Sequence, residues 1–341
     1  MTKLLLTGAT GYVGGAALDR IIAFNIPDLE VTVFLRSESK AAPILAKYPG
    51  IVTVKVGKAA YSDPEFSRLV KEADIIVHAG DSSDDSVSAD VISTNIKDGV
   101  LLIHTSGTYI LSDFTELDQK ISRKFDDERD IETVTSWGLE HPHRVIDIKI
   151  LDIHKFKPTV NTIIVCPPLI YGVSTGPVNR VSQQIPLLIQ LAAETKANRL
   201  FGTGHASWSN VHINDVAELY AILVKTYLQD ASKLAVNDQG YYFVENGETS
   251  WKDLISALDE PLVKYKVIDS QHTSDKLRPW TEDDLKEVRG QQFAKRYYEI
   301  YRSNSSSKAT RARKLGWQPK EKDVYSTLDE AVNVYLNGLS D

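Results

Sequence analysis

The sequence predicts an α/β fold, in which a doubly wound parallel sheet is followed by a smaller C-terminal α/β part. Through residues 1–172, short runs rich in β-formers alternate with segments of helical period. Some of these runs, such as residues 75–77 and 163–165, are continuously apolar, which is typical of strands covered on both faces. A glycine-rich turn follows the first run. With 341 residues, 42% hydrophobic and 25% charged, the chain is long enough for one large or two smaller cores.

The first part contains six strand candidates separated by helical segments. The expected strands are residues 3–7, 30–36, 51–56, 74–79, 100–105 and 159–166. We expect helices over residues 12–24, 63–73 and 144–157, and the last stops before Pro158 because proline disfavours a helical conformation in the residue before it. Ser62, with Glu65 three residues later, predicts a capping box at the second helix.

The second part is a smaller and more mixed set of elements. Its expected helices are residues 183–194, 214–229, 250–258, 281–288, 291–303 and 325–339, and its expected strands are residues 199–208, 241–245 and 263–268. The polar segment 303–308 is expected at the surface. Because no repeat or long linker separates the parts, we assign residues 1–172, with parts of 205–240, to the first domain and residues 173–341 mainly to the second.

Composition excludes several classes of protein. The net charge of −7 is modest and the basic residues are scattered, so a nucleic-acid partner is not expected. A single cysteine, Cys166, rules out an internal disulfide and fits a reducing compartment, so we predict a cytoplasmic location. No run approaches the length of a membrane span. His141, His143 and His154 do not share one helical face, and no metal site is predicted.

The glycine turn is Gly8-Ala-Thr-Gly11-Tyr-Val-Gly14, between the first strand and the first helix. Glycine permits a tight turn and a close approach of the backbone to a phosphate. The free N–H groups and the dipole of the helix start favour the negative charge. The turn therefore predicts a Rossmann-type site for a nicotinamide dinucleotide, in which the pyrophosphate contacts Gly8, Thr10, Gly11, Tyr12, Val13 and Gly14.

The end of the second strand bears on which dinucleotide binds. NAD-binding proteins tend to carry an acidic residue about 20 residues past the turn, for the ribose 2′-OH. Here that position is Arg36, with Ser37 and Lys40 nearby, and this combination suits the 2′-phosphate of NADP. The alternative, NAD, requires Glu38 to act as the acidic residue at a later strand end. We favour NADP.

The spacing of the glycine turn resembles that of the short-chain dehydrogenase/reductase superfamily. Further segments resemble its extended branch, also described as the NAD-dependent epimerase/dehydratase family; they are residues 73–80, 166–172, 202–217 and 312–319. The resemblance implies that Ala79 and Gly80 pass the adenosine side of the cofactor and that Thr105, Pro168 and Leu169 lie toward its nicotinamide. It also implies that residues 173–341 form a substrate-binding part, and it allows a homodimer.

The catalytic residues of that family are only partly present. The family uses a Tyr-x-x-x-Lys pair and a hydroxyl residue at the end of strand five. Strand five ends here in His104-Thr-Ser-Gly-Thr-Tyr109, with Gly107 where the hydroxyl is expected, so Ser106 or Thr108 must supply it. Lys149 matches the lysine, with an expected contact to the nicotinamide ribose, but Val145 stands four residues before it. No Tyr-x-x-x-Lys occurs in the sequence.

Substitute proton donors are Tyr109, His143 and Asp147, and the substrate cleft is expected to include Tyr109, Tyr171 and Trp208. The leading interpretation is an NADP(H)-dependent oxidoreductase that acts on a small carbonyl or alcohol with an unorthodox proton donor. One alternative is a non-catalytic dinucleotide-binding redox sensor or regulator. Another is an epimerase or dehydratase acting on a substrate like a sugar nucleotide.

Overall fold

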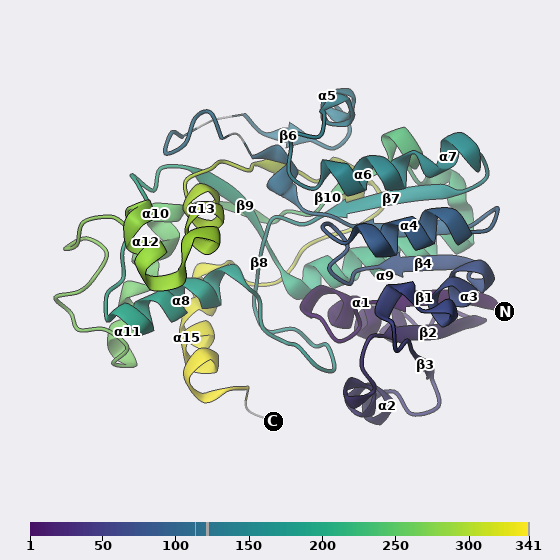
Figure 1. Ribbon diagram of the computed structural model, residues 1–341, viewed down its shortest axis with the longest axis horizontal. Coiled ribbons are helices and arrows are strands. Elements are labelled where there is room, and N and C mark those ends of the chain that lie inside the picture. Colours follow the sequence, from purple (N-terminus) through teal and green to yellow (C-terminus); the bar gives the residue numbers. More distant parts are fainter. Residues whose placement is uncertain (113, 121–122, 340–341) are drawn as a thin grey trace.

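The computed structural model describes residues 1–112, 114–120 and 123–339. A seven-stranded sheet runs in the order β10-β7-β5-β4-β1-β2-β3, and all of its strand pairs are parallel (Figure 1). The strands are β1 (Thr2–Thr7), β2 (Leu29–Leu35), β3 (Val52–Val56), β4 (Ile75–His78), β5 (Leu101–Thr105), β7 (Asn161–Cys166) and β10 (Tyr241–Phe243). The predicted fold class is confirmed. Strand order reverses between β1 and β4, and ligands of such sheets bind beyond the carboxyl ends of the strands at that point.

Helices cover the sheet. In one group, α1 (Tyr12–Ala23) packs along α9 (Ile213–Asp230). In another, α3 (Pro64–Glu72) contacts α4 (Ser86–Asn95), which in turn contacts α6 (Arg144–Leu151). The short helices α2 (Ala41–Lys47), α5 (Ile131–Ser136) and α7 (Ile153–Phe156) complete this half. The predicted capping box is wrong: Asp63 caps α3 by accepting the Glu65 N–H, and Ser62 ends a 3-10 turn before it.

The second half has its own sheet and core, to the left of the large sheet in Figure 1. Its strands are β8 (Leu169–Tyr171), β9 (Ser207–His212) and β11 (Gly247–Ser250); its helices are α8 (Gln184–Thr195), α10 (Trp251–Ala257), α11 (Asp259–Lys264), α12 (Glu282–Arg289), α13 (Gln291–Ile300) and α15 (Leu328–Asn337). The predicted strand 263–268 is wrong, because its first two residues end α11 and Lys266 takes a left-handed φ of 57°. The predicted strand 199–208 overlaps β9 only at its last two residues.

Residues 303–307 of the polar segment 303–308 are buried, contrary to the predicted surface position, and only Lys308 is exposed. Residues 303–307 run between the two halves of the molecule and end in β12 (Ser307–Lys308), which pairs with β6 (Phe125–Asp126). The Ser305 N–H donates to the Ser207 carbonyl (2.9 Å), and the Ser305 hydroxyl donates to the Thr108 carbonyl (2.6 Å). Small hydroxyl side chains fit where backbones approach closely and satisfy them by hydrogen bonds, so a polar sequence here fills an interior seam.

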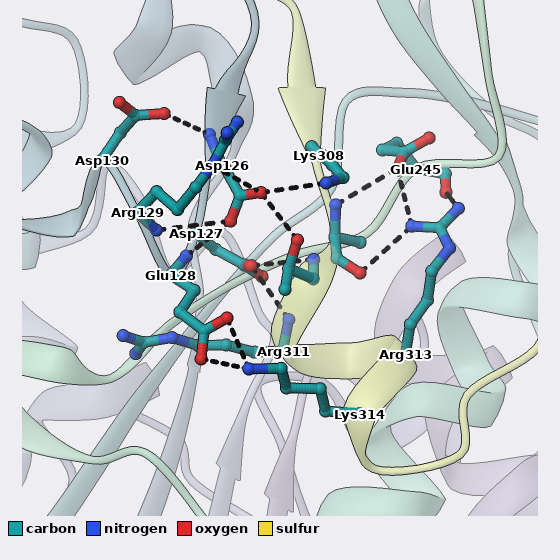
Figure 2. A network of polar contacts seen from close by, with 12 residues as sticks. Asp126, Asp127, Glu128, Arg129, Asp130, Glu245, Lys308, Arg311, Arg313 and Lys314 are labelled. Carbon is teal, nitrogen blue, oxygen red and sulfur yellow. Dashed lines mark hydrogen bonds and ion pairs between the residues drawn. The ribbon is translucent and has the colours of Figure 1, made fainter.

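A cluster of charged residues fastens the C-terminal segment to the first half (Figure 2). Asp127 accepts the N–H groups of Thr310 and Arg311 at 2.9 and 3.0 Å and that of Phe243 at 3.0 Å. In Figure 2 this carboxylate points at the start of α14 (Thr310–Lys314), while Glu128 pairs with Lys314 on the outside. The cluster therefore joins three segments that are distant in the sequence.

Within the part of the chain that the structure describes, no helix has both the length and the apolar character needed to cross a membrane.

Candidate cofactor site and catalytic residues

The glycine turn has the geometry of a phosphate site. Gly8 has a φ of 79°, and a Cβ there would overlap the Ala79 carbonyl, while a Cβ on Gly14 would overlap the Gly8 carbonyl. Gly11 is the N-cap of α1 and forms no side-chain cap. Because the first turn of α1 carries no acidic side chain, its free N–H groups can receive a pyrophosphate.

The adenosine end of a dinucleotide is expected where β2, β4 and the glycine turn meet. Arg36 follows β2 directly, is exposed, and places its guanidinium carbon 5.7 Å from the centre of the Tyr61 ring. The Tyr61 hydroxyl donates to the Gly80 carbonyl (3.3 Å). Glu38 lies farther along, exposed, in a 3-10 turn. The position expected to hold an acidic residue in an NAD site therefore holds a guanidinium supported by an aromatic ring.

A cavity of about 430 Å³ extends from the glycine turn to the second half of the molecule. Of the predicted site residues, those that line it are Gly11, Tyr12, Val13, Ala79, Thr105, Ser106, Thr108, Tyr109, Pro168 and Trp208. Tyr171 was expected in the substrate cleft but is a core residue, and its hydroxyl donates to the Lys322 carbonyl (2.7 Å). The cavity thus runs from the helix start that suits a pyrophosphate to the proposed catalytic region.

His143 is the imidazole that lines this cavity. It is the N-cap of α6, with a left-handed φ of 66°, a conformation that is uncommon outside glycine. Its Nδ1 lies 3.1 Å from Asp84 Oδ1, and that hydrogen bond is the largest cause of the lowered pKa of Asp84. Its Nε2 lies 3.6 Å from where a Cβ on Gly107 would stand. The His143 imidazole, which Asp84 holds, therefore faces Gly107, the position where the family's hydroxyl residue is expected.

Val145 and Lys149 are not among the described residues that line the cavity. Val145 is 53% exposed, and Lys149 pairs with Asp90 of α4 at 2.5 Å. The helix starts at Arg144, and its N-cap His143 lines the cavity. Asp147, four residues after His143, is fully buried.

Asp147 is fully buried beneath the cavity floor. Its Oδ2 accepts from the Tyr241 hydroxyl (2.9 Å), which accepts from Arg144 (2.7 Å). Its Oδ1 lies 4.0 Å from His104 Nε2, and neither ring nitrogen of His104 has a hydrogen-bond partner among the described residues. Burial raises the pKa of Asp147 and lowers that of His104, so both tend to be neutral.

The hydroxyl candidates at the end of β5 differ in availability. Thr108 is buried and receives a hydrogen bond from the Ser305 hydroxyl (2.9 Å). Thr105 shares a hydrogen bond of 2.6 Å with the Tyr220 hydroxyl. The Ser106 hydroxyl is buried and forms no hydrogen bond of full geometry among the described residues, but it is close enough to Asp147 and Cys166 to offset part of the rise that burial causes in the pKa of each. Of the three, Ser106 is the least firmly engaged.

Sequence reasoning named His143 without ranking it above Lys149, and it missed Asp84. The local signal was present, since Asp84 follows β4 in the loop where a cofactor site is expected. No cluster of three or more histidine, cysteine or acidic side chains within the described ranges has the arrangement of a metal site.

Comparison with known proteins agrees with this architecture. Residues 142–237 match the model of the NAD dependent epimerase/dehydratase family. Over 289 residues, which cover 78% of this chain and 80% of the relative, the chain is 28% identical to "Oxidase ucsJ" of an Acremonium species.

Two solved structures share the fold over nearly the whole chain. One is the yeast methylglyoxal/isovaleraldehyde reductase Gre2 with NADPH, with a TM-score of 0.63, 16% identity and 99% of both chains covered. The other is dTDP-glucose 4,6-dehydratase of Bacillus anthracis with NAD, with a TM-score of 0.63, 15% identity and 98% and 97% of the two chains covered. The resemblance to the extended family that the motifs indicate is confirmed by the matched segment and by the fold.

Proposed function

Because the chain shares the fold and a matched segment with the NAD dependent epimerase/dehydratase family, we propose that it is an NADP(H)-dependent oxidoreductase acting on a small carbonyl or alcohol. In this proposal His143, held by Asp84, exchanges the proton. One observation carries it: a single cavity joins the free N-terminus of α1 to the His143 imidazole across Gly107. The name of the Acremonium relative and the reductase activity of Gre2 are consistent with redox chemistry.

The proposed preference for NADP rests on Arg36. A guanidinium presents several donors to a phosphate, and Tyr61 beneath it limits the positions it takes. Once bound, the dinucleotide would supply or accept a hydride at its nicotinamide ring. Side chains of the protein carry out the proton transfer.

The His143–Asp84 pair supplies what reduction of a carbonyl needs. As a C–H bond forms at the carbonyl carbon, the π electron pair moves to oxygen, and a proton from His143 Nε2 neutralises that oxygen. Asp84 orients the ring through Nδ1 and stabilises its charged form. In the oxidation direction, neutral His143 accepts the hydroxyl proton. Proton transfer by a positioned side chain is worth about 10²- to 10⁴-fold in rate.

The test uses His143→Gln, with His154→Gln on α7 as the matched control. NADPH binding is measured by fluorescence titration, and turnover by NADPH consumption on a panel of aldehydes and ketones. We expect His143→Gln to lower kcat by about 100-fold or more, with unchanged NADPH affinity, and the control to match wild type. Undiminished turnover in His143→Gln would overturn the assigned donor, and failure to bind either dinucleotide would overturn the whole proposal.

A second candidate is a dinucleotide-binding sensor without catalysis. The observation that favours it is that Val145 and Gly107 stand where the family's tyrosine and strand-five hydroxyl are expected, and that Lys149 is not among the described residues lining the cavity. Tight binding of NADPH with no turnover on any carbonyl of the panel would favour the sensor over the oxidoreductase.

A further inference from the structure

The end of the cavity away from the glycine turn has an aromatic wall. Tyr109 lies between His143 and Trp208, with ring centres 5.8 and 6.1 Å away. The Trp208 indole N–H donates to the Ser303 carbonyl (3.0 Å), so its hydrogen-bonding group is already engaged. Burial raises the pKa of Tyr109 to about 12, so its phenol is neutral. With Ile300 and Tyr297 of α13 beside them, these side chains suit an apolar group.

One cationic side chain faces this wall. Among the described residues that line the cavity, Arg296 of α13 is the only lysine or arginine. Its nearest carboxylate is Asp84, whose Oδ2 lies 3.9 Å from the guanidinium, at the limit of an ion pair. The same carboxylate holds His143 through Oδ1 at 3.1 Å. Arg296 therefore keeps most of its donor capacity, and Asp84 is already committed to the imidazole.

Resting on the proposed function, we propose that the substrate is an oxo acid, a carbonyl compound that carries a carboxylate and an apolar side chain. Arg296 binds the carboxylate, and Tyr109 and Trp208 contact the apolar side chain. A carboxylate matches the fork of one guanidinium. The doubly charged phosphate group fits less well, because Asp81 and Asp84 are close to the same cavity and would repel it.

Asp84 links the two side chains. The His143 Nδ1 lies 3.1 Å from one oxygen of its carboxylate, and the Arg296 guanidinium lies 3.9 Å from the other. Both side chains line the same cavity, so a substrate whose carboxylate binds Arg296 has its carbonyl in the cavity that His143 lines. We test 2-oxo acids, in which the carboxylate and the carbonyl are adjacent, and Asp84 retains the imidazole when Arg296 turns to the substrate.

The competing explanation is that Arg296, whose side chain is 58% exposed, is a solvated charge at the rim. The two explanations differ in what happens when the substrate loses its charge. Phenylpyruvate and 4-methyl-2-oxopentanoate are therefore compared with their methyl esters, which keep the carbon skeleton and the carbonyl. The variants are Arg296→Gln and, as control, Lys286→Gln, an exposed cation on the neighbouring helix α12.

We expect wild type to favour each acid over its ester in kcat/KM. Arg296→Gln should lose about 10- to 100-fold on the acids, mainly through KM, and less than about 3-fold on the esters. Lys286→Gln should behave as wild type. A measurement independent of turnover is calorimetric binding of the corresponding 2-hydroxy acids to the NADPH-loaded protein, in which no hydride can be transferred; Arg296→Gln should abolish this binding.

Equal use of acids and esters by wild type, or equal losses on both in Arg296→Gln, would overturn the oxo-acid assignment while leaving the oxidoreductase intact. If no carbonyl is reduced, the oxidoreductase fails, and calorimetry then decides the anion site alone. Arg296-dependent binding of the hydroxy acids would support it, and absent or Arg296-independent binding would refute it.

Discussion

Replacing Arg36 with alanine is expected to weaken NADPH binding and to leave NADH binding unchanged. Arg36 is exposed, follows β2 directly and lies over Tyr61, so its contact with a 2′-phosphate would be a partly solvated, charge-assisted hydrogen bond. Such bonds contribute about 1.5–3 kcal/mol, which corresponds to about a 10- to 100-fold increase in the Kd for NADPH. Because the interaction is partly solvated, we expect a value toward the lower end of that range.

The assay is fluorescence titration with both nucleotides at low and high salt. NADH lacks the phosphate, so its Kd reports any general damage to the site. Arg68→Ala is the matched control, since this exposed arginine on α3 pairs with Glu65 and Glu72 away from the cavity. High salt should narrow the gap between NADPH and NADH in wild type. Equal loss of both nucleotides in Arg36→Ala, or no loss of either, would refute the assigned role of Arg36.

Four further predictions concern catalysis and stability. Val145→Tyr recreates Tyr-x-x-x-Lys in the sequence but should not raise turnover, because position 145 is 53% exposed and outside the cavity; a gain in kcat would contradict the placement of α6. Asp84→Asn should lower kcat by about 10- to 100-fold with unchanged NADPH affinity, because the imidazole loses its orienting carboxylate; a loss of nucleotide binding alone would argue against this role. Asp127→Ala leaves three backbone N–H groups without an acceptor and should lower the free energy of unfolding in urea by about 3 kcal/mol. Glu128→Ala breaks an exposed ion pair and should lower it by about 1 kcal/mol or less. Equal losses in the two variants would refute the importance of the buried cluster. Burial lowers the pKa of His78 to about 3, below its unfolded value of 6.5, so the free energy of unfolding should fall as the pH drops below 6.5, by up to about 1.4 kcal/mol per pH unit from this residue. Urea unfolding of wild type and His78→Gln at about pH 7.5 and 5.5 checks this. Equal losses of unfolding free energy in both proteins would exclude His78 as the cause.

Most of the first half of the fold is predictable from local pattern. The parallel strands are continuous apolar runs, and Gly8 and Gly14 are required where backbones approach too closely for a Cβ. One error lies where the two halves meet. Residues 303–307 are polar yet buried, because their partners are backbone groups of β9 and of the loop after β5, contributed by residues about 100 to 200 positions away.

The proton-transfer site shows the same division. Strand five ends without its expected hydroxyl, and the sequence alone reveals this absence at Gly107. Which residue replaces the missing tyrosine depends on where α6 begins and which of its faces meets the cavity. A left-handed His143 caps that helix and lines the cavity, Asp147 is fully buried, and Lys149 pairs with Asp90 of α4.

By itself, the sequence determined the α/β class, the glycine turn, the position of Arg36 and the absence of the family's catalytic pair, because each depends on local periodicity, on backbone freedom or on residue identity. Only the tertiary structure decided that His143 meets Asp84 and that Arg296 shares that carboxylate. Those three side chains come from a loop after β4, the start of α6 and the middle of α13. Only packing of the two halves brings them together.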